Sequence, residues 1–156
     1  MGKGVVFVCL LAAVAMFGAS SSTASATTAA APSAAAPIIV PAGSAKWEPL
    51  QGYAGVEQAI LSGDPSQAGS QYAERLKLAD GVKFPPHTHP QSEQVTVLSG
   101  TLLVGVGKTM DPSKMVALPA GSYVWVPANV PHYAAAKGET IIEIHGVGPD
   151  TIDMVK

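Results

Sequence analysis

Short apolar runs recur about every ten residues from Lys46 to the end of the chain, and glycine, proline, asparagine or aspartate separates them. No stretch of ten or more residues in this part keeps the 3.6-residue period of an amphipathic helix. Short apolar segments between frequent turns are typical of antiparallel sheets. The pattern predicts an all-β sandwich or barrel, and about nine short strands in one unit favour a closed or nearly closed barrel.

The runs give a map of the expected strands, which are 55–61, 71–78, 83–89, 93–98, 101–106, 114–118, 122–126, 131–136 and 140–145. Ser99-Gly100 is interpreted as a turn, and Lys137-Gly138 as the turn of a β-hairpin. Trp125, Val95 and Val97 are expected to fill the barrel. Glu74 shares a strand face with Leu76 and Leu78, so it either lines the interior or, as we expect, faces solvent at a frayed strand end.

The first 26 residues have the order of a secretory signal peptide. Lys3 precedes an uncharged apolar run from Val5 to about Phe17, and Ala24-Ser25-Ala26 forms an A-x-A cleavage site. The run is shorter than the roughly 17–25 residues that cross a bilayer, so we favour a cleaved signal over the alternative, a retained membrane anchor. We therefore expect an exported protein, periplasmic or extracellular, that has no membrane attachment after cleavage.

Composition divides the rest of the chain and excludes several functions. Residues 27–45 are rich in Ala, Thr, Ser and Pro, which predicts a flexible linker before a folded domain at 46–156. Charged residues make up 13% and the net charge is −2, so nothing indicates binding to nucleic acid or to an anionic membrane. Cys9, the one cysteine, lies in the apolar run, so a disulfide, a thiolate metal ligand and a cysteine nucleophile are excluded from the mature protein.

The stretch from Gly81 to Gly100 concentrates side chains that can bind a metal. Side chains alternate along a strand, so His87 and His89 would point the same way, with their Cα atoms roughly 7 Å apart. Two imidazoles at that separation can bind one ion through bonds of about 2.1 Å. Glu93 follows a short polar break and can supply a third ligand. His132 begins a later strand, and a barrel can bring it to the same place; the alternative is that these histidines only satisfy surface turns.

The chain resembles the cupins, a superfamily of small β-barrels. The first cupin motif, G-x5-H-x-H-x3-E-x6-G, is matched at every fixed position by Gly81, His87, His89, Glu93 and Gly100. The second, G-x5-P-x-G-x2-H-x3-N, is matched by Gly121, Pro127 and His132. Asn129 stands at the middle glycine, where asparagine tolerates a left-handed backbone, and Ala136 replaces the final asparagine.

The resemblance, which covers residues 81–136, implies a small single-domain cupin barrel in which His87, His89, Glu93 and His132 bind one divalent metal. Three histidines and a carboxylate suit Fe, Mn, Ni, Zn or Cu without choosing among them. Redox metals would support dioxygenase-like chemistry, or decarboxylation by a lyase, on a small molecule that coordinates the metal. Glu93 would act as a base after leaving the metal.

Two alternatives to an enzyme remain at this point. One is a barrel that binds a small ligand or a metal without turnover, and the other is a purely structural cupin, against which the complete ligand set argues. We favour the enzyme. His145 is a candidate catalytic base in the pocket, although we favour the alternative that it is a strand-end histidine hydrogen-bonded near Gly146. The resemblance also allows a homodimer, because cupins often dimerise, and residues 46–61 could form its interface.

Overall fold

Strands account for nearly all of the regular structure in residues 36–156, the part of the chain that the computed structural model describes. They are β1 (Glu48–Pro49), β2 (Val56–Ser62), β3 (Gln71–Leu78), β4 (Lys83–Thr88), β5 (Glu93–Val106), β6 (Val116–Pro119), β7 (Tyr123–Val126), β8 (His132–Val147) and β9 (Asp153–Met154). A short 3-10 turn, η1 (Pro112–Lys114), precedes β6. Within these residues no helix has the length and apolar character needed to cross a membrane. The predicted all-β fold is confirmed, and the predicted signal peptide lies outside the described residues.

The two longest strands, β5 and β8, pair antiparallel along almost their whole lengths. Glu93 lies opposite Gly146 at one end of the pair, and Val106 lies opposite His132 at the other. The register shifts in the middle, where residues 138–140 of β8 lie opposite Gly100 of β5. Both Gly100 and Gly138 have a φ of +74°, a left-handed conformation that glycine adopts without strain. The pair therefore bends at this bulge instead of ending there.

This continuity corrects two sequence predictions. Ser99-Gly100 is not a turn between two strands, and Lys137-Gly138 is not the turn of a hairpin, because each lies inside one long strand. A left-handed glycine between two apolar runs has the same sequence pattern in a turn as in a bulge. Which of the two forms depends on long-range pairing between β5 and β8, and a local pattern does not contain that information.

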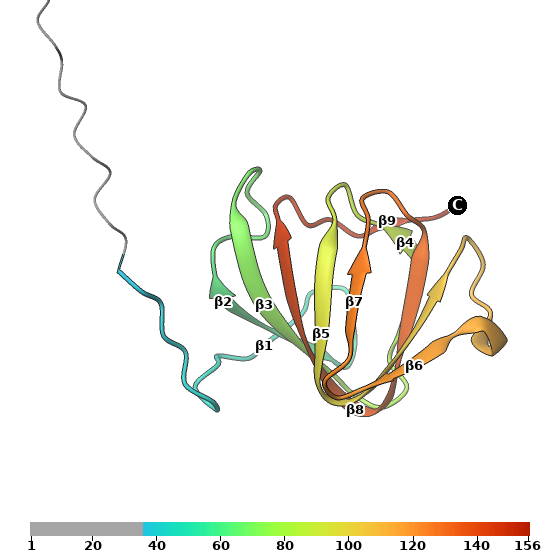
Figure 1. Cartoon of the computed structure of the whole chain (residues 1–156), viewed down its shortest axis with the longest axis horizontal. Helices are drawn as coiled ribbons and strands as arrows, with labels where there is room; N and C mark the ends of the chain where they lie inside the picture. Colours follow the sequence, from blue (N-terminus) through green and yellow to red (C-terminus); the bar gives the residue numbers. More distant parts are fainter. Residues whose placement is uncertain (1–35) are drawn as a thin grey trace, which may run out of the picture. The chain divides into compact units, whose positions relative to one another are not determined.

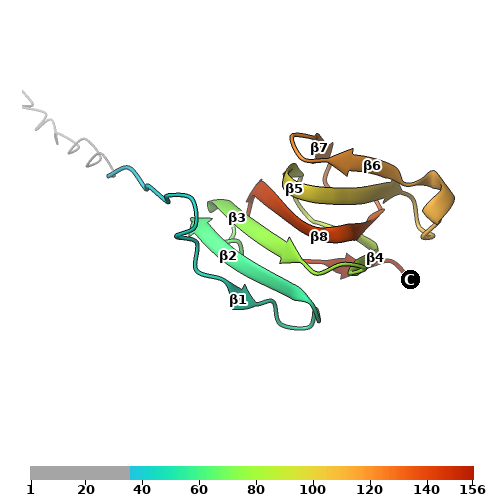
Figure 2. The ribbon, with the colours of Figure 1, turned by 90° about the horizontal axis from the view of Figure 1, so that it is seen from below.

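The bend divides the sheet into two facing halves. On one side of the bend, the C-terminal half of β8 pairs with β3, and the N-terminal half of β5 pairs with β7. On the other side, β4 and β6 pair with the remaining halves of β8 and β5. Figure 1 shows the strands curling around a common interior above the bend, and Figure 2 shows the same curled sheet from below. The predicted barrel is confirmed.

Apolar side chains from both halves fill the interior, among them Leu76, Leu78, Val95, Val97, Leu102, Ile142 and Ile144. Val95 and Val97 are buried as predicted, at 4% and 1% exposure. Trp125 is not: its side chain is 56% exposed. Val124 and Val126 face the interior from β7, so alternation turns the larger Trp125 outward.

One carboxylate lies on the inward face of β3. Glu74 alternates with the buried residues Tyr72 and Leu76 and is only 3% exposed, so the expectation that it faces solvent is wrong. Burial raises the pKa of Glu74 to about 7, although a hydrogen bond donated by the Gln58 side chain opposes the increase. The charges of Asp150 and Glu93 add to the increase.

The bend predicts different costs for two glycine substitutions. A Cβ added to Gly100 would lie 2.3 Å from the Glu139 carbonyl oxygen, whereas one added to Gly138 would meet nothing within 4 Å. Both alanine variants incur the strain of a left-handed backbone, about 1–2 kcal/mol. Gly100→Ala should lose roughly 2 kcal/mol more than Gly138→Ala, because it also displaces packed backbone. Urea unfolding measures both, and equal losses would contradict the packing account.

Burial of Glu74 predicts that its contribution to the stability of the metal-free protein falls as pH rises. The folded pKa of about 7 lies above the ordinary value of 4.5, so the contribution is complete below pH 4.5 and is lost as pH rises through 7. Glu74→Gln removes this titration. From pH 4 to pH 8, the variant should therefore gain on the order of 3 kcal/mol relative to the wild type. Urea unfolding of both proteins in chelator at the two pH values checks this; a constant difference would show that Glu74 ionises without a burial cost.

Candidate metal centre

Strand pairing brings two of the predicted ligands together. His87 of β4 lies directly opposite His132 of β8, a position in which cross-strand side chains are in contact. Between Phe84 and His87 the register shifts by one residue at Pro85 and Pro86, so Phe84 and His87 both face inward despite their odd spacing. Proline supplies no N–H to a ladder, which fits its place in this bulge.

A turn holds the third histidine beside them. Asn129 has a φ of 61° and is the one non-glycine residue with positive φ in the described part of the chain, as its place in the motif predicts. Its backbone N–H donates to the His89 carbonyl oxygen at 2.8 Å. The turn that leads into His132 is therefore hydrogen-bonded to the segment that carries His89, although the two lie far apart in the sequence.

The three imidazoles converge in the interior. Ligand atoms of His87, His89 and His132 all lie within 4.8 Å of one another, and the residues are 4%, 7% and 4% exposed. Two nitrogens bound to one ion at about 2.1 Å can be at most about 4.2 Å apart. The observed spacing is therefore close to what one shared ion requires.

Each imidazole is oriented through its other nitrogen. Nδ1 of His87 lies 2.7 Å from the Pro85 carbonyl oxygen, and Nδ1 of His132 lies 3.0 Å from that of Val130. Nδ1 of His89 lies 2.9 Å from the Thr151 carbonyl oxygen. A carbonyl only accepts, so each Nδ1 carries the proton and each Nε2 keeps a free lone pair. This is the tautomer that a metal-binding histidine needs.

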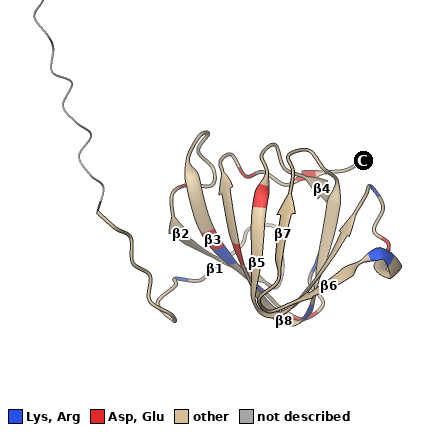
Figure 3. Ribbon diagram, viewed as in Figure 1, with Lys and Arg blue, Asp and Glu red and all other residues tan. Residues whose placement is uncertain are grey.

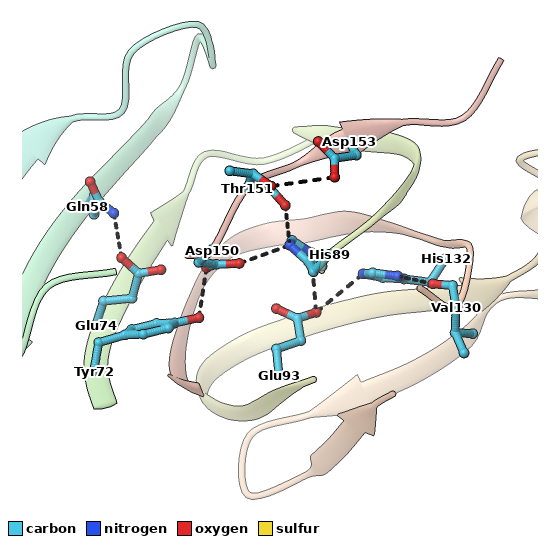
Figure 4. A network of polar contacts seen from close by, with 10 residues as sticks. All are labelled: Gln58, Tyr72, Glu74, His89, Glu93, Val130, His132, Asp150, Thr151 and Asp153. Atoms are coloured by element: carbon cyan, nitrogen blue, oxygen red, sulfur yellow. Dashed lines mark hydrogen bonds and ion pairs between the residues drawn. The ribbon is translucent and has the colours of Figure 1, made fainter. Parts of the chain in front are cut away.

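Glu93 adds a carboxylate to the group. It is 7% exposed, and its Oε1 lies 3.3 Å from Nε2 of His132 and 3.8 Å from Nε2 of His89 (Figure 4). The carboxylate thus lies on the side of the imidazoles that carries their free lone pairs. A metal ion fits this donor set, in which three ring nitrogens and one carboxylate oxygen from buried residues lie close together.

Asp150, which sequence analysis did not single out, supports His89 from behind. Its Oδ1 lies 2.9 Å from Nδ1 of His89, and the Tyr72 hydroxyl donates to its Oδ2 at 2.8 Å (Figure 4). Burial alone would raise the pKa of Asp150, but the hydrogen bonds from His89 and Tyr72 outweigh burial and lower it. A carboxylate that accepts from a ligating histidine fixes the ring and increases its basicity. Nothing in the local sequence pairs Asp150 with His89, since the contact depends on the fold.

Two histidines titrate differently because their surroundings differ. Burial lowers the pKa of His87 to about 4, so its ring is neutral near pH 7. Burial also acts to lower the pKa of His89, but the hydrogen bond to Asp150 and the charge of Glu93 outweigh it and raise the pKa. His89 is therefore the ring that holds a proton more readily when no cation is bound.

The four side chains lie on the wall of a cavity of about 130 Å³. Its remaining surface is mostly apolar and comes from both halves of the barrel, including Leu76, Phe84, Val95, Leu102, Val124 and Ile144. Glu74, Gln58 and Asp150 supply the other polar groups. An apolar cavity with a few convergent polar groups is the usual form of a small-molecule site.

The structure does not bring His145 into this cavity. Its side chain is 48% exposed, and its Nε2 contacts Glu143 at 3.0 Å on the outer face of β8, where Glu143 also pairs with Arg75. Alternation along β8 places Ile142 and Ile144 inside and His145 outside. The predicted catalytic role of His145 therefore has no geometric support.

Comparison with known proteins agrees with this description. Residues 75–147 match the family model described as the cupin domain, a range that runs from the second half of β3 to the end of β8 and includes all four residues of the metal centre. No curated protein matches the chain.

Several solved structures share the fold at low sequence identity. The polyketide cyclase RemF from Streptomyces resistomycificus has a TM-score of 0.60 at 18% identity, covering 76% of this chain and 84% of its own. An RmlC-like cupin from Shewanella frigidimarina NCIMB 400 has a TM-score of 0.57 at 20% identity, covering 73% and 94%. A chain from the crystal structures of the DMSP lyases RdDddP and RnDddQII has a TM-score of 0.56 at 18% identity, covering 72% and 63%. The family match, both motifs and the bent β5–β8 pair agree in supporting a cupin fold for this barrel.

Proposed function

We propose that this chain is a metal-dependent enzyme that acts on a small molecule bound directly to the metal, either as an oxidoreductase of the dioxygenase type or as a lyase. The observation that supports it most is the convergence of His87, His89 and His132, each of which offers one ring nitrogen within 4.8 Å of the other two beside a cavity. A purely structural barrel has no use for buried imidazoles oriented in this way. We include Glu93 as the fourth ligand, because its carboxylate contacts the same nitrogens.

The residues of the chain have separable roles in this proposal. The three histidines hold the cation and keep it positive enough to activate a ligand, because neutral imidazoles bring no charge. When bound, the metal supplies Lewis acidity and, for a redox metal, electron transfer. Glu93 is placed to accept a proton from the substrate, since its carboxylate lies beside two ligating nitrogens. The apolar walls exclude water and strengthen these interactions.

The fold does not decide between the two reaction classes. Relatives with this barrel include a polyketide cyclase and a DMSP lyase by name, so the same scaffold serves different chemistry. We also propose that the protein is exported before it acts, on the strength of the signal-like order of residues 1–26. Metal would then be acquired outside the cytoplasm, where copper and zinc compete most strongly for nitrogen ligands.

The metal centre predicts the behaviour of three histidine variants. His87→Ala and His132→Ala each remove one of three nitrogen ligands, so metal content should fall from about one ion per chain to near zero after dialysis against a chelator. His145→Ala is the matched control, because this histidine lies on the outer face, and it should keep its metal. Elemental analysis of the three proteins and the wild type provides the measurement. Full metal content in His87→Ala would rule out the proposed centre.

The proposed enzyme activity predicts that the metal-loaded wild type converts a small substrate. Protein loaded separately with iron, manganese, nickel, copper and zinc is incubated with small carboxylates and catechol-like compounds, while oxygen uptake and carbon dioxide release are followed. An oxidoreductase consumes oxygen with a redox metal, and a decarboxylating lyase releases carbon dioxide without oxygen. Glu93→Gln should reduce turnover by about 100-fold or more, because it removes the base. Tight zinc binding without turnover for any metal would instead assign a non-catalytic binding barrel.

A further inference from the structure

A buried polar pair lies on the part of the cavity wall that β2 and β3 form. Glu74 and Gln58 both line the cavity, and the Gln58 amide donates a hydrogen bond to Oε2 of Glu74. The other carboxyl oxygen of Glu74 points to the side of the network that holds Asp150 and His89 (Figure 4). The proposed metal chemistry does not use this pair.

The second oxygen of Glu74 is available to a ligand. Within residues 36–156, Gln58 is the hydrogen-bond partner of the Glu74 carboxyl, and it contacts Oε2 alone. In the same residues no fully enclosed side-chain nitrogen or oxygen lacks a partner. Oε1 of Glu74 therefore faces open space in the cavity although the residue is 3% exposed. A carboxyl oxygen that faces the cavity and has no hydrogen-bond partner among the described residues favours any ligand that can donate a hydrogen bond to it.

The charges around the cavity indicate which donor fits. Three acidic side chains, Glu74, Glu93 and Asp150, line it, and no Lys or Arg is among the described residues that do so. Figure 3 shows the Lys and Arg positions on β3, near the bend and around η1. Asp150 is paired with His89, and Glu93 faces the metal centre, but Glu74 has only a neutral amide. A cation is the partner that best neutralises a buried carboxylate, and a second anionic group would be repelled.

The cavity also limits the size of the ligand. A dry cavity of about 150 Å³ holds benzene, which has six non-hydrogen atoms. The present cavity of about 130 Å³ therefore suits a ligand of about six such atoms. A short amino acid with its carboxylate and its amine at opposite ends has this size.

We propose that Glu74 and Gln58 form a second ligand subsite, which binds the ammonium group of a small amino acid whose carboxylate is held at the metal centre. Glu74 accepts a charged hydrogen bond from the ammonium, and Gln58 keeps the carboxyl oriented. The apolar walls enclose the short carbon chain between the two ends. An ammonium at this position also offsets the burial that raises the pKa of Glu74. This inference rests on the proposed metal function.

The test compares three acids of equal size on the full-length protein loaded with Zn²⁺. They are 3-aminopropanoate, 3-hydroxypropanoate and butanoate, which differ only in the group at the end distant from the carboxylate. Calorimetry at pH 7.5 should show the amine binding at least about 10-fold more tightly than butanoate and the hydroxy acid, since charged hydrogen bonds are the stronger ones. Equal binding of the three acids, or no binding of the amine, overturns the proposal.

Two variants test whether Glu74 is the residue that causes the preference for the amine. Glu74→Gln should weaken binding of the amine by about 10- to 100-fold and leave butanoate within about 3-fold of the wild type. Glu143→Gln is the matched control, because this carboxylate lies on the outer face against Arg75, and its ligand preference should equal that of the wild type. An amine preference retained in Glu74→Gln overturns the assignment to this residue.

Metal content separates the two proposals. Loss of Zn²⁺ from the wild type means that the metal centre itself is wrong. Stoichiometric Zn²⁺ with no preference for the amine refutes the second subsite alone. Should Glu74→Gln fail to fold, the comparison of the three acids on the wild type still decides, because it needs no variant.

Discussion

The shared bend of β5 and β8 is the constraint on which the rest of the structure depends. The two strands stay paired on both sides of the bulge at Gly100 and Gly138, so their inward faces oppose each other across one interior. That pairing also positions His132 at the start of β8, directly opposite His87 of β4. The interior and its metal-binding group therefore follow from one continuous hydrogen-bond ladder, and a left-handed glycine is what allows the ladder to turn without breaking.

Backbone carbonyls, more than side chains, fix the chemistry of the imidazoles. His87 and His132 each contact the carbonyl two residues earlier, so their orientation is set locally by the bulge at Pro85-Pro86 and by the turn that contains Asn129. His89 differs, because its carbonyl and its carboxylate both come from the segment after β8, at Thr151 and Asp150. The C-terminal segment thus completes a site that the two motifs begin.

Features that depend on residues close together in the sequence were mostly predicted correctly, whereas features that depend on distant strands or segments mostly were not. Short-range spacing was enough to predict that His87 and His89 face the same way and that Asn129 is left-handed, because strand alternation and turn chemistry are local rules. The convergence of His132 with them was predicted from the expected barrel and from the resemblance to the cupins. The same rules mistook the two bulge glycines for turns, since only the partner strand distinguishes the cases. They also left Asp150 unnoticed, because its contact with His89 spans most of the domain.

Alternation did contain the signal for Glu74, which shares a strand face with Tyr72, Leu76 and Leu78. The general rarity of buried carboxylates outweighed that signal. Trp125 shows the reverse error: its size suggested burial, whereas alternation against Val124 and Val126 placed it outside. For both residues the period of the strand was a better guide than the type of side chain.

Three carboxyl groups in an otherwise apolar cavity reduce the stability of the barrel unless each has a partner. Asp150 has two neutral or cationic donors, and Glu93 lies where a bound cation would neutralise it. Glu74 has only the Gln58 amide, and burial raises its pKa in spite of that hydrogen bond. Ligands that supply positive charge at either place bind the folded state alone and stabilise it. A cation bound at either carboxylate would therefore offset the cost of burying it and would couple ligand binding to the stability of the fold.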